Sequence, residues 1–133
     1  MKRYFFPLFA VAALVFVFGC ATPLEKDAEA LQGSWSSVDG RAVFTFVGNQ
    51  LILSRDENKI VTTYELLAET AETPRGIVIK AAKGFGLSED IFGIYRVDGD
   101  SFKLCASRRG FPVEFREDRE RRVELAVFQR VKR

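Results

Sequence analysis

One cysteine near the start of the chain stands where a lipid can be attached covalently. Cys20 ends the tetrapeptide Val-Phe-Gly-Cys at 17–20, which follows two basic residues and an apolar run over 5–18. A basic start, an apolar core and a small residue before the cleavage point are typical of an export signal, and a cysteine at that point is typical of a bacterial lipoprotein. We therefore predict a signal peptide at 1–19 and a thioether-linked lipid on Cys20.

The lipid defines the expected partner and location. The apolar run is too short to remain as a comfortable membrane-spanning helix, whereas acyl chains such as palmitate contribute about 0.8 kcal/mol per buried methylene. We expect the mature chain to be held at a membrane of the cell envelope through Cys20. Ala21, rather than Asp, follows the cysteine, which favours the periplasmic face of the outer membrane in a cell with two membranes.

Other reactive side chains are few. The sequence has no histidine, which excludes a histidine-based triad and the usual zinc and iron ligands. Cys105 has no second cysteine to pair with once Cys20 is lipidated, and a buried core position is the expected one. Carboxylates such as Glu65 and Glu89 have no fixed geometry in sequence. We predict no catalytic residues, no metal and no cofactor.

The charge pattern argues against nucleic acid as a partner. Removal of Lys2 and Arg3 with the signal peptide would leave 18 basic and 18 acidic residues, and nucleic-acid binding needs a basic face. The stretch 108–133 carries nine basic and five acidic side chains. A solvated face of mixed charge and a patch for anionic headgroups both fit that excess.

A short helix is expected directly after the lipidated cysteine. Thr22 can cap it, Pro23 suits the first helical position, and Glu25 completes a capping box. Gly33 is a plausible end, so the predicted helix spans 23–32. Almost no linker then separates the lipid from folded structure.

The rest of the chain follows a two-residue period interrupted by turn residues, which predicts antiparallel strands. Eight strands are expected, at 33–38, 42–47, 50–55, 59–68, 76–82, 90–97, 101–107 and 122–131. The predicted fold class is all-β, an eight-stranded antiparallel up-and-down barrel with a short N-terminal helix, and a sandwich stays open. The domains are the signal peptide at 1–19, the anchored N-terminus and helix at 20–32, and the barrel at 33–133.

Two motifs stand out along the chain: an early Leu-Gln-Gly-Ser-Trp at 31–35 and a late Tyr-Arg-Val-Asp-Gly-Asp-Ser-Phe-Lys-Leu-Cys at 95–105. Their order resembles an uncharacterised lipocalin-like family best known from planctomycetes. The resemblance covers nearly all of the mature chain and implies a calycin-type barrel in which Trp35 closes one end. Val97 stands where Leu is usual, and Arg108 to Gly110 replaces a stretch often containing Pro and Gly. The family implies no activity.

Candidate ligand contacts come from two places. The first is the apolar face of the strands, and the second is the long connection at 108–121, whose apolar residues can form a lid over the barrel mouth, an irregular edge strand or a contact with lipid. The candidate residues are Phe44, Phe46, Leu53, Tyr64, Tyr95, Phe111 and Phe115.

Two functions from different classes are consistent with these features. The first is a membrane-tethered barrel that binds a small apolar or amphipathic ligand without catalysis. The second is an envelope interaction or inhibitor protein with a solid core, which binds a protein or polymer through its loops. Strand patterning alone does not distinguish a packed interior from a cavity.

Overall fold

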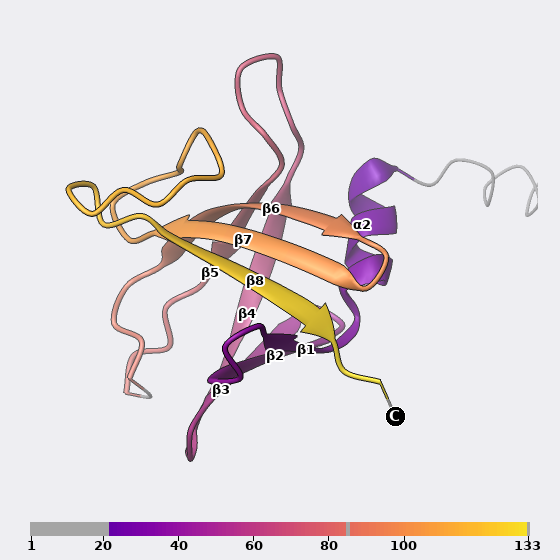
Figure 1. The fold of residues 1–133 in the computed structure, drawn as a ribbon, viewed down its shortest axis with the longest axis vertical. Helices are drawn as coiled ribbons and strands as arrows, with labels where there is room; N and C mark the ends of the chain where they lie inside the picture. The colour runs from indigo at the N-terminus through magenta and orange to yellow at the C-terminus, as the bar shows by residue number, and fades with distance from the viewer. Residues whose placement is uncertain (1–21, 85, 133) are drawn as a thin grey trace, which may run out of the picture.

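The computed structural model describes residues 22–84 and 86–132. The predicted signal peptide at 1–19 and the lipidation site at Cys20 lie outside these residues. One helix and eight strands make up the fold in Figure 1. They are α2 (Pro23–Leu31), β1 (Gly33–Ser37), β2 (Ala42–Val47), β3 (Gln50–Arg55), β4 (Asn58–Leu67), β5 (Gly76–Ile79), β6 (Ile91–Asp98), β7 (Ser101–Ser107) and β8 (Glu124–Arg130).

The eight strands form a closed barrel in chain order. Each strand pairs antiparallel with the next, as Phe44 with Leu53 between β2 and β3, and β8 pairs antiparallel with β1, as Phe128 with Ser37. This confirms the prediction of an all-β, eight-stranded antiparallel barrel with one short helix and rules out the sandwich. The barrel leaves no unpaired sheet edge, which removes a common route to aggregation.

The helix forms as its sequence predicts. The Thr22 hydroxyl accepts a hydrogen bond from the backbone N–H of Glu25 at 3.2 Å, which satisfies one of the unpaired donors of the first turn. Gly33 follows the last turn with φ of 110°, a backbone angle that favours glycine and turns the chain into β1. In Figure 1, α2 lies across one end of the barrel, which we call the closed end.

The closed end is filled with apolar side chains. Trp35 is fully buried, and its indole N–H donates to the Leu31 carbonyl at 2.8 Å. The Arg130 guanidinium lies over the indole ring, 4.2 Å from its centre. The ring of Phe102 packs against Trp35 at 5.7 Å and against Phe46 at 5.9 Å. Trp35 thus stands between the helix and the core.

Residues 108–123, which we call the outer segment, pack on the outside of the barrel over 111–116, while both ends of the segment reach the rim at the end of the barrel opposite α2. The Phe111 ring lies 5.2 Å from Phe92, and the Arg96 guanidinium lies 5.1 Å from the Phe115 ring. A Cβ added to Gly76 would lie only 3.2 Å from Phe111, so this glycine makes room for the ring. Of the three arrangements predicted for this connection, the lid over the barrel mouth is not formed: Phe111 packs beside Phe92 on the outside of the barrel, and Phe115 lies under the Arg96 guanidinium of β6.

The same cover explains why Cys105 is buried. Cys105 and Lys103 lie on the outer side of β7, yet Cys105 is fully buried and Lys103 is exposed. The Cys105 thiol donates to the backbone carbonyls of Glu114 and Arg116 at 3.5 and 3.6 Å. The alternation of side chains along β7 would place Cys105 in solvent, but the outer segment encloses it.

All contacts described here lie among residues 22–84 and 86–132. The core cluster runs from Leu31 to Phe128, and α2 contacts β4 and β6. A chain that begins at Ala21 therefore keeps every contact described here.

Candidate functional site

The barrel is hollow at the end opposite α2, which we call the mouth. Two adjoining cavities of about 760 and 640 Å³ open there, and both volumes fall within the range of small-molecule sites. The two cavities adjoin, because five residues line both of them: Phe44, Leu53, Arg122, Glu124 and Ala126.

The walls of the mouth are apolar because strand alternation places every second side chain inside. Leu53 pairs with both Phe44 and Ile60 across neighbouring strands, and all three side chains are half-buried. The ring of Phe44 lies 4.6 Å from that of Phe128, which is 2 % exposed. The apolar wall therefore runs from the open mouth down to the packed core.

The connection between β5 and β6 covers part of the mouth. Leu87 from this connection is only 4 % exposed and packs into the core. Two hydrogen bonds hold the connection in shape, from the N–H of Ala82 to the Leu87 carbonyl at 2.8 Å and from the N–H of Ala81 to the Asp90 carboxylate at 2.7 Å. Sequence reasoning missed Leu87. Its position in a turn-rich connection, after Gly84 and Gly86, was a signal that this leucine could fold back onto the core.

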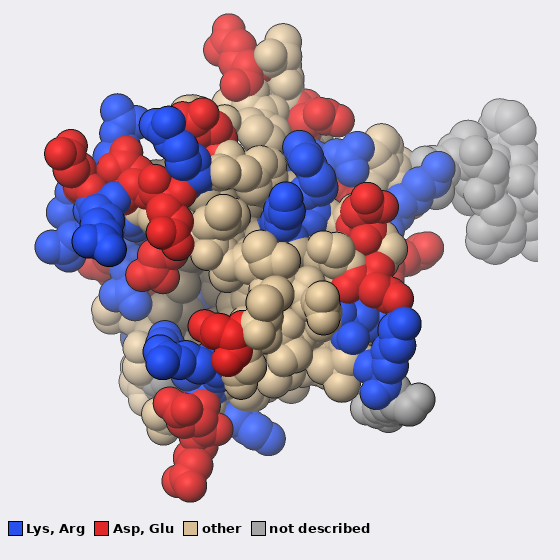
Figure 2. Space-filling view, viewed as in Figure 1, with Lys and Arg blue, Asp and Glu red and all other residues tan. Residues whose placement is uncertain are grey.

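Charged side chains surround the apolar walls. Those that line the two cavities are Arg41, Arg55, Arg108, Arg109, Arg119 and Arg122, together with Asp39, Glu89, Glu117 and Glu124. We call the six basic residues the mouth arginines. Figure 2 shows side chains of both signs crowded over the left-hand end of the molecule, where Figure 1 places the outer segment. The site is an apolar cavity with a charged rim and an excess of two positive charges.

Asp39 is an acidic residue of the rim whose pKa is lowered, mainly by hydrogen bonds. Its carboxylate accepts hydrogen bonds from the Ser37 hydroxyl at 2.6 Å and from the backbone N–H of Arg41 at 3.0 Å. These bonds, with weaker contributions from the positive charges of Arg41 and Arg55, hold the pKa of Asp39 below its usual value. Asp39 therefore stays ionised and fixes the turn at the rim.

The seven candidate ligand contacts are not gathered at one place. Phe44 and Leu53 line both cavities. Phe46 and Tyr95 are buried in the core, with exposed fractions of 1 and 2 %, and Tyr64 lies at the closed end, where its hydroxyl donates to the Gly48 carbonyl at 2.7 Å. Phe111 and Phe115 lie on the outer wall, because the middle of the outer segment packs against β6 and not over the mouth.

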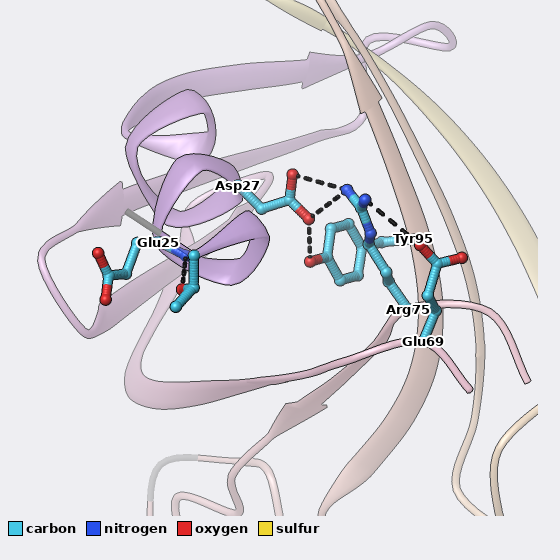
Figure 3. Close-up of polar contacts among 6 residues, drawn as sticks. Glu25, Asp27, Glu69, Arg75 and Tyr95 are labelled. Atoms are coloured by element: carbon cyan, nitrogen blue, oxygen red, sulfur yellow. Dashed lines mark hydrogen bonds and ion pairs between the residues drawn. The ribbon is translucent and has the colours of Figure 1, made fainter. Parts of the chain in front are cut away.

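A polar cluster that sequence reasoning missed joins the helix to the barrel at the closed end (Figure 3). Asp27 on α2 accepts hydrogen bonds from one Arg75 nitrogen at 3.1 and 2.9 Å and from the Tyr95 hydroxyl at 2.6 Å. Arg75 also contacts Glu69 at 3.4 Å. The buried residue Asp27 is thus fully paired, which is the condition for burying a carboxylate at acceptable cost.

The environment of this cluster raises the pKa of its tyrosine, Tyr95. Burial first, then the hydrogen bond to Asp27 and the negative charge of that carboxylate, raise the pKa of Tyr95 far above its usual value. Burial also raises the pKa of Tyr64. Both hydroxyls are therefore neutral donors that hold the closed end together.

The cluster and the mouth differ in what they can do chemically. At the closed end, the side chains of Asp27, Tyr95 and Arg75 bond to one another, whereas the mouth is open to a ligand.

The cysteine of the described residues is not activated for chemistry. Burial raises the pKa of the Cys105 thiol, which disfavours the reactive thiolate. Among residues 22–84 and 86–132, no group of three or more histidine, cysteine, aspartate or glutamate side chains is placed to hold a metal ion. In the same part of the chain, no helix has the length and hydrophobicity to cross a membrane.

Comparisons with models of protein families, with curated proteins and with solved structures found no match. The structure itself defines the class: a closed eight-stranded antiparallel β-barrel, sealed by a helix at one end and hollow at the other.

Proposed function

We propose that the protein is a lipoprotein of the cell envelope, tethered to a membrane through Cys20, whose lipocalin-like barrel binds a small apolar or amphipathic ligand without catalysis. The hollow mouth carries this proposal. Its walls are half-buried Phe44, Leu53 and Ile60, while the floor is the packed core. Half-buried aromatic and aliphatic side chains around a concave opening are what a ligand can cover with a gain of hydrophobic free energy.

The hollow favours ligand binding over the alternative of an interaction or inhibitor protein with a solid core. The interior around Trp35, Phe46 and Phe102 in the closed half is solid, whereas Phe44, Leu53 and Ile60 at the mouth are only half-buried. An inhibitor that binds through its loops needs no cavity, and filling the mouth with larger side chains would stabilise such a protein. Cavities of 760 and 640 Å³ therefore support a ligand.

The proposed anchor suits this arrangement. Consecutive Cα atoms lie about 3.8 Å apart, so the Cα of Cys20 is within about 8 Å of Thr22, the residue that caps α2. A lipid on Cys20 would hold the barrel by the side of its closed end, with the mouth at the opposite end of the barrel. The ligand could then enter without passing the anchor.

Uptake of a fluorescent fatty-acid probe by the chain from Ala21 onward tests the binding site. We expect saturable uptake, and lipid retained after purification should be visible by native mass spectrometry. Ala126→Trp should abolish uptake because Ala126 lines both cavities. Val61→Trp, on the outer side of β4 with 54 % exposure, is the matched control and should bind as the wild type does. Equal uptake by both variants, or none by the wild type, would reject the proposal.

The anchor is tested separately in the full chain. Cys20→Ser should leave an unprocessed or mislocalised precursor, because only the thiol can accept the lipid. The wild-type protein should stay with the membrane fraction at high salt, since buried acyl chains are insensitive to ionic strength. Mature wild-type protein in the soluble fraction without lipid would contradict the anchor and leave the binding experiment unaffected.

A further inference from the structure

We infer that the ligand of the mouth is a single-chain amphiphile with an anionic oxygen head group, which the mouth arginines recognise while the apolar tail enters the barrel. This inference rests on the proposed function and specifies the chemical class of its ligand. It depends on which arginines of the protein already have partners and which do not.

Among residues 22–84 and 86–132, the arginines away from the mouth are engaged with other side chains. Arg75, Arg116, Arg121 and Arg130 each form an ion pair with a carboxylate, at 2.9, 3.4, 3.8 and 3.3 Å. Arg96 lies over the Phe115 ring. Each of these five guanidinium groups therefore has a partner within the protein.

The six mouth arginines differ in this respect. Within the part of the chain that the structure describes, none of them lies within 4.0 Å of a carboxylate oxygen or over an aromatic ring. A guanidinium carries five N–H donors in a planar fork that matches the geometry of a carboxylate or a phosphate. These side chains concentrate unused donors at the opening of an apolar cavity.

The carboxylates at the mouth do not cancel this charge. Asp39 is held by Ser37 and the backbone of Arg41, and Glu89, Glu117 and Glu124 form no ion pair among the described residues. The four carboxylates leave the rim with two positive charges in excess. A neutral ligand would leave the arginine donors to water, and a cationic ligand would be repelled by the net charge.

The order of polar and apolar groups sets the direction of the ligand. Arg122 lies at the rim and lines both cavities, and Arg55 follows Leu53 on the inner side of β3 where the strand ends. Deeper in the barrel the walls are Phe44, Leu104 and Phe128. An apolar tail therefore points toward the core, and the head group meets the guanidinium groups at the surface.

Four ligands with the same twelve-carbon chain test the inference on the chain from Ala21 onward: laurate, dodecyl phosphate, dodecanol and dodecylamine, each below its critical micelle concentration. We expect laurate, dodecyl phosphate or both to bind about tenfold tighter than dodecanol, a difference equal to about 1.4 kcal/mol. Raising the salt concentration should reduce this advantage because the rim is exposed to solvent. The two anionic ligands distinguish a carboxylate from a phosphate head group.

Two double variants with the same change in net charge separate recognition from a general effect of charge. Arg55→Gln with Arg122→Gln should weaken binding of the anionic ligands about tenfold and leave dodecanol unchanged. Arg116→Gln with Arg121→Gln removes two paired arginines of the outer segment that do not line the mouth cavities, and it should leave all affinities unchanged. Urea unfolding of both variants verifies that each is folded.

The outcomes keep the two proposals apart. If dodecanol or dodecylamine binds as tightly as the anionic ligands, or if both double variants behave alike, the inference is overturned and the ligand-binding barrel remains. If none of the four ligands binds the wild type, the ligand-binding function itself is rejected.

Discussion

The two ends of the barrel are built from similar side chains but use them differently. At the closed end, Trp35 is fully buried and donates to Leu31, and Asp27 is paired with Arg75 and Tyr95. At the mouth, Phe44 and Leu53 are half-buried and the arginines have no carboxylate partner among the described residues. Aromatic and charged groups occur at both ends. At the closed end they hydrogen-bond and pack with other protein groups, whereas the mouth arginines and the walls of the mouth face the cavity.

This contrast indicates where stability and binding reside. A buried aromatic ring and a paired buried carboxylate contribute to the free energy of unfolding. Half-buried apolar walls and unpaired cations contribute little to folding and are available to a ligand. Substitutions at the closed end should therefore change stability, and matched substitutions at the mouth should change binding.

The largest difference is expected between two aromatic residues. Trp35→Ala should lower the free energy of unfolding by about 3–5 kcal/mol, the range for a fully buried aromatic side chain. Phe44→Ala should cost less than half as much, because Phe44 is already partly exposed to the cavity. Urea unfolding of the two variants measures both values. A similar loss in both would show that the mouth is as tightly packed as the closed end.

A second comparison uses two aspartates. Asp27→Ala should cost about 2–3 kcal/mol because it leaves the buried Tyr95 hydroxyl and Arg75 without their acceptor. Asp39→Ala at the mouth should cost less, because Asp39 is exposed and water can replace its contacts. The same urea experiment tests the pair. If Asp27→Ala unfolds at the wild-type denaturant concentration, α2 does not depend on this cluster.

The smallest effect concerns alkaline pH. The pKa of Tyr95 is raised in the folded protein, mainly by burial and by its bond to Asp27, whereas an unfolded tyrosine titrates near pH 10. Above about pH 10 the unfolded chain therefore releases a proton that the folded chain retains, and stability falls with a slope of at most about 1.4 kcal/mol per pH unit for this group.

Unfolding midpoints measured between about pH 9 and 11 test this slope. Tyr95→Phe should make the pH dependence shallower, with the remainder due to Tyr64 and Cys105, whose pKa values are also raised. An unchanged slope in Tyr95→Phe would show that this hydroxyl does not couple the closed end to pH.

The sequence predicted the elements of the fold closely. The helix was expected at 23–32 and is found at Pro23–Leu31, and the strand expected at 50–55 is Gln50–Arg55. Local signals suffice here, because a capping residue, a glycine turn and a two-residue period act over a few residues. The expected strand at 76–82 is shorter, Gly76–Ile79, because the chain leaves the sheet to place Leu87 in the mouth.

The candidate site was only partly predictable. Phe44 and Leu53 were identified as inward-facing residues, and the structure places both on the cavity wall. Phe111 and Phe115 were expected to need a contact surface, and a lid over the mouth, an irregular edge strand and a contact with lipid all stayed open for them. The surface they use, beside Phe92 and Arg96, is formed by strands far from them in sequence.

What the sequence by itself determined is therefore the number, type and order of the elements, since these depend on neighbours along the chain. Only the tertiary structure decided that Asp27 is buried, that Cys105 is covered and that the barrel is solid at one end and hollow at the other. The physical reason is the same in each case: burial depends on side chains from distant strands, such as Arg75 and Tyr95 around Asp27, and the period of a single strand is the same around a packed core and around a cavity.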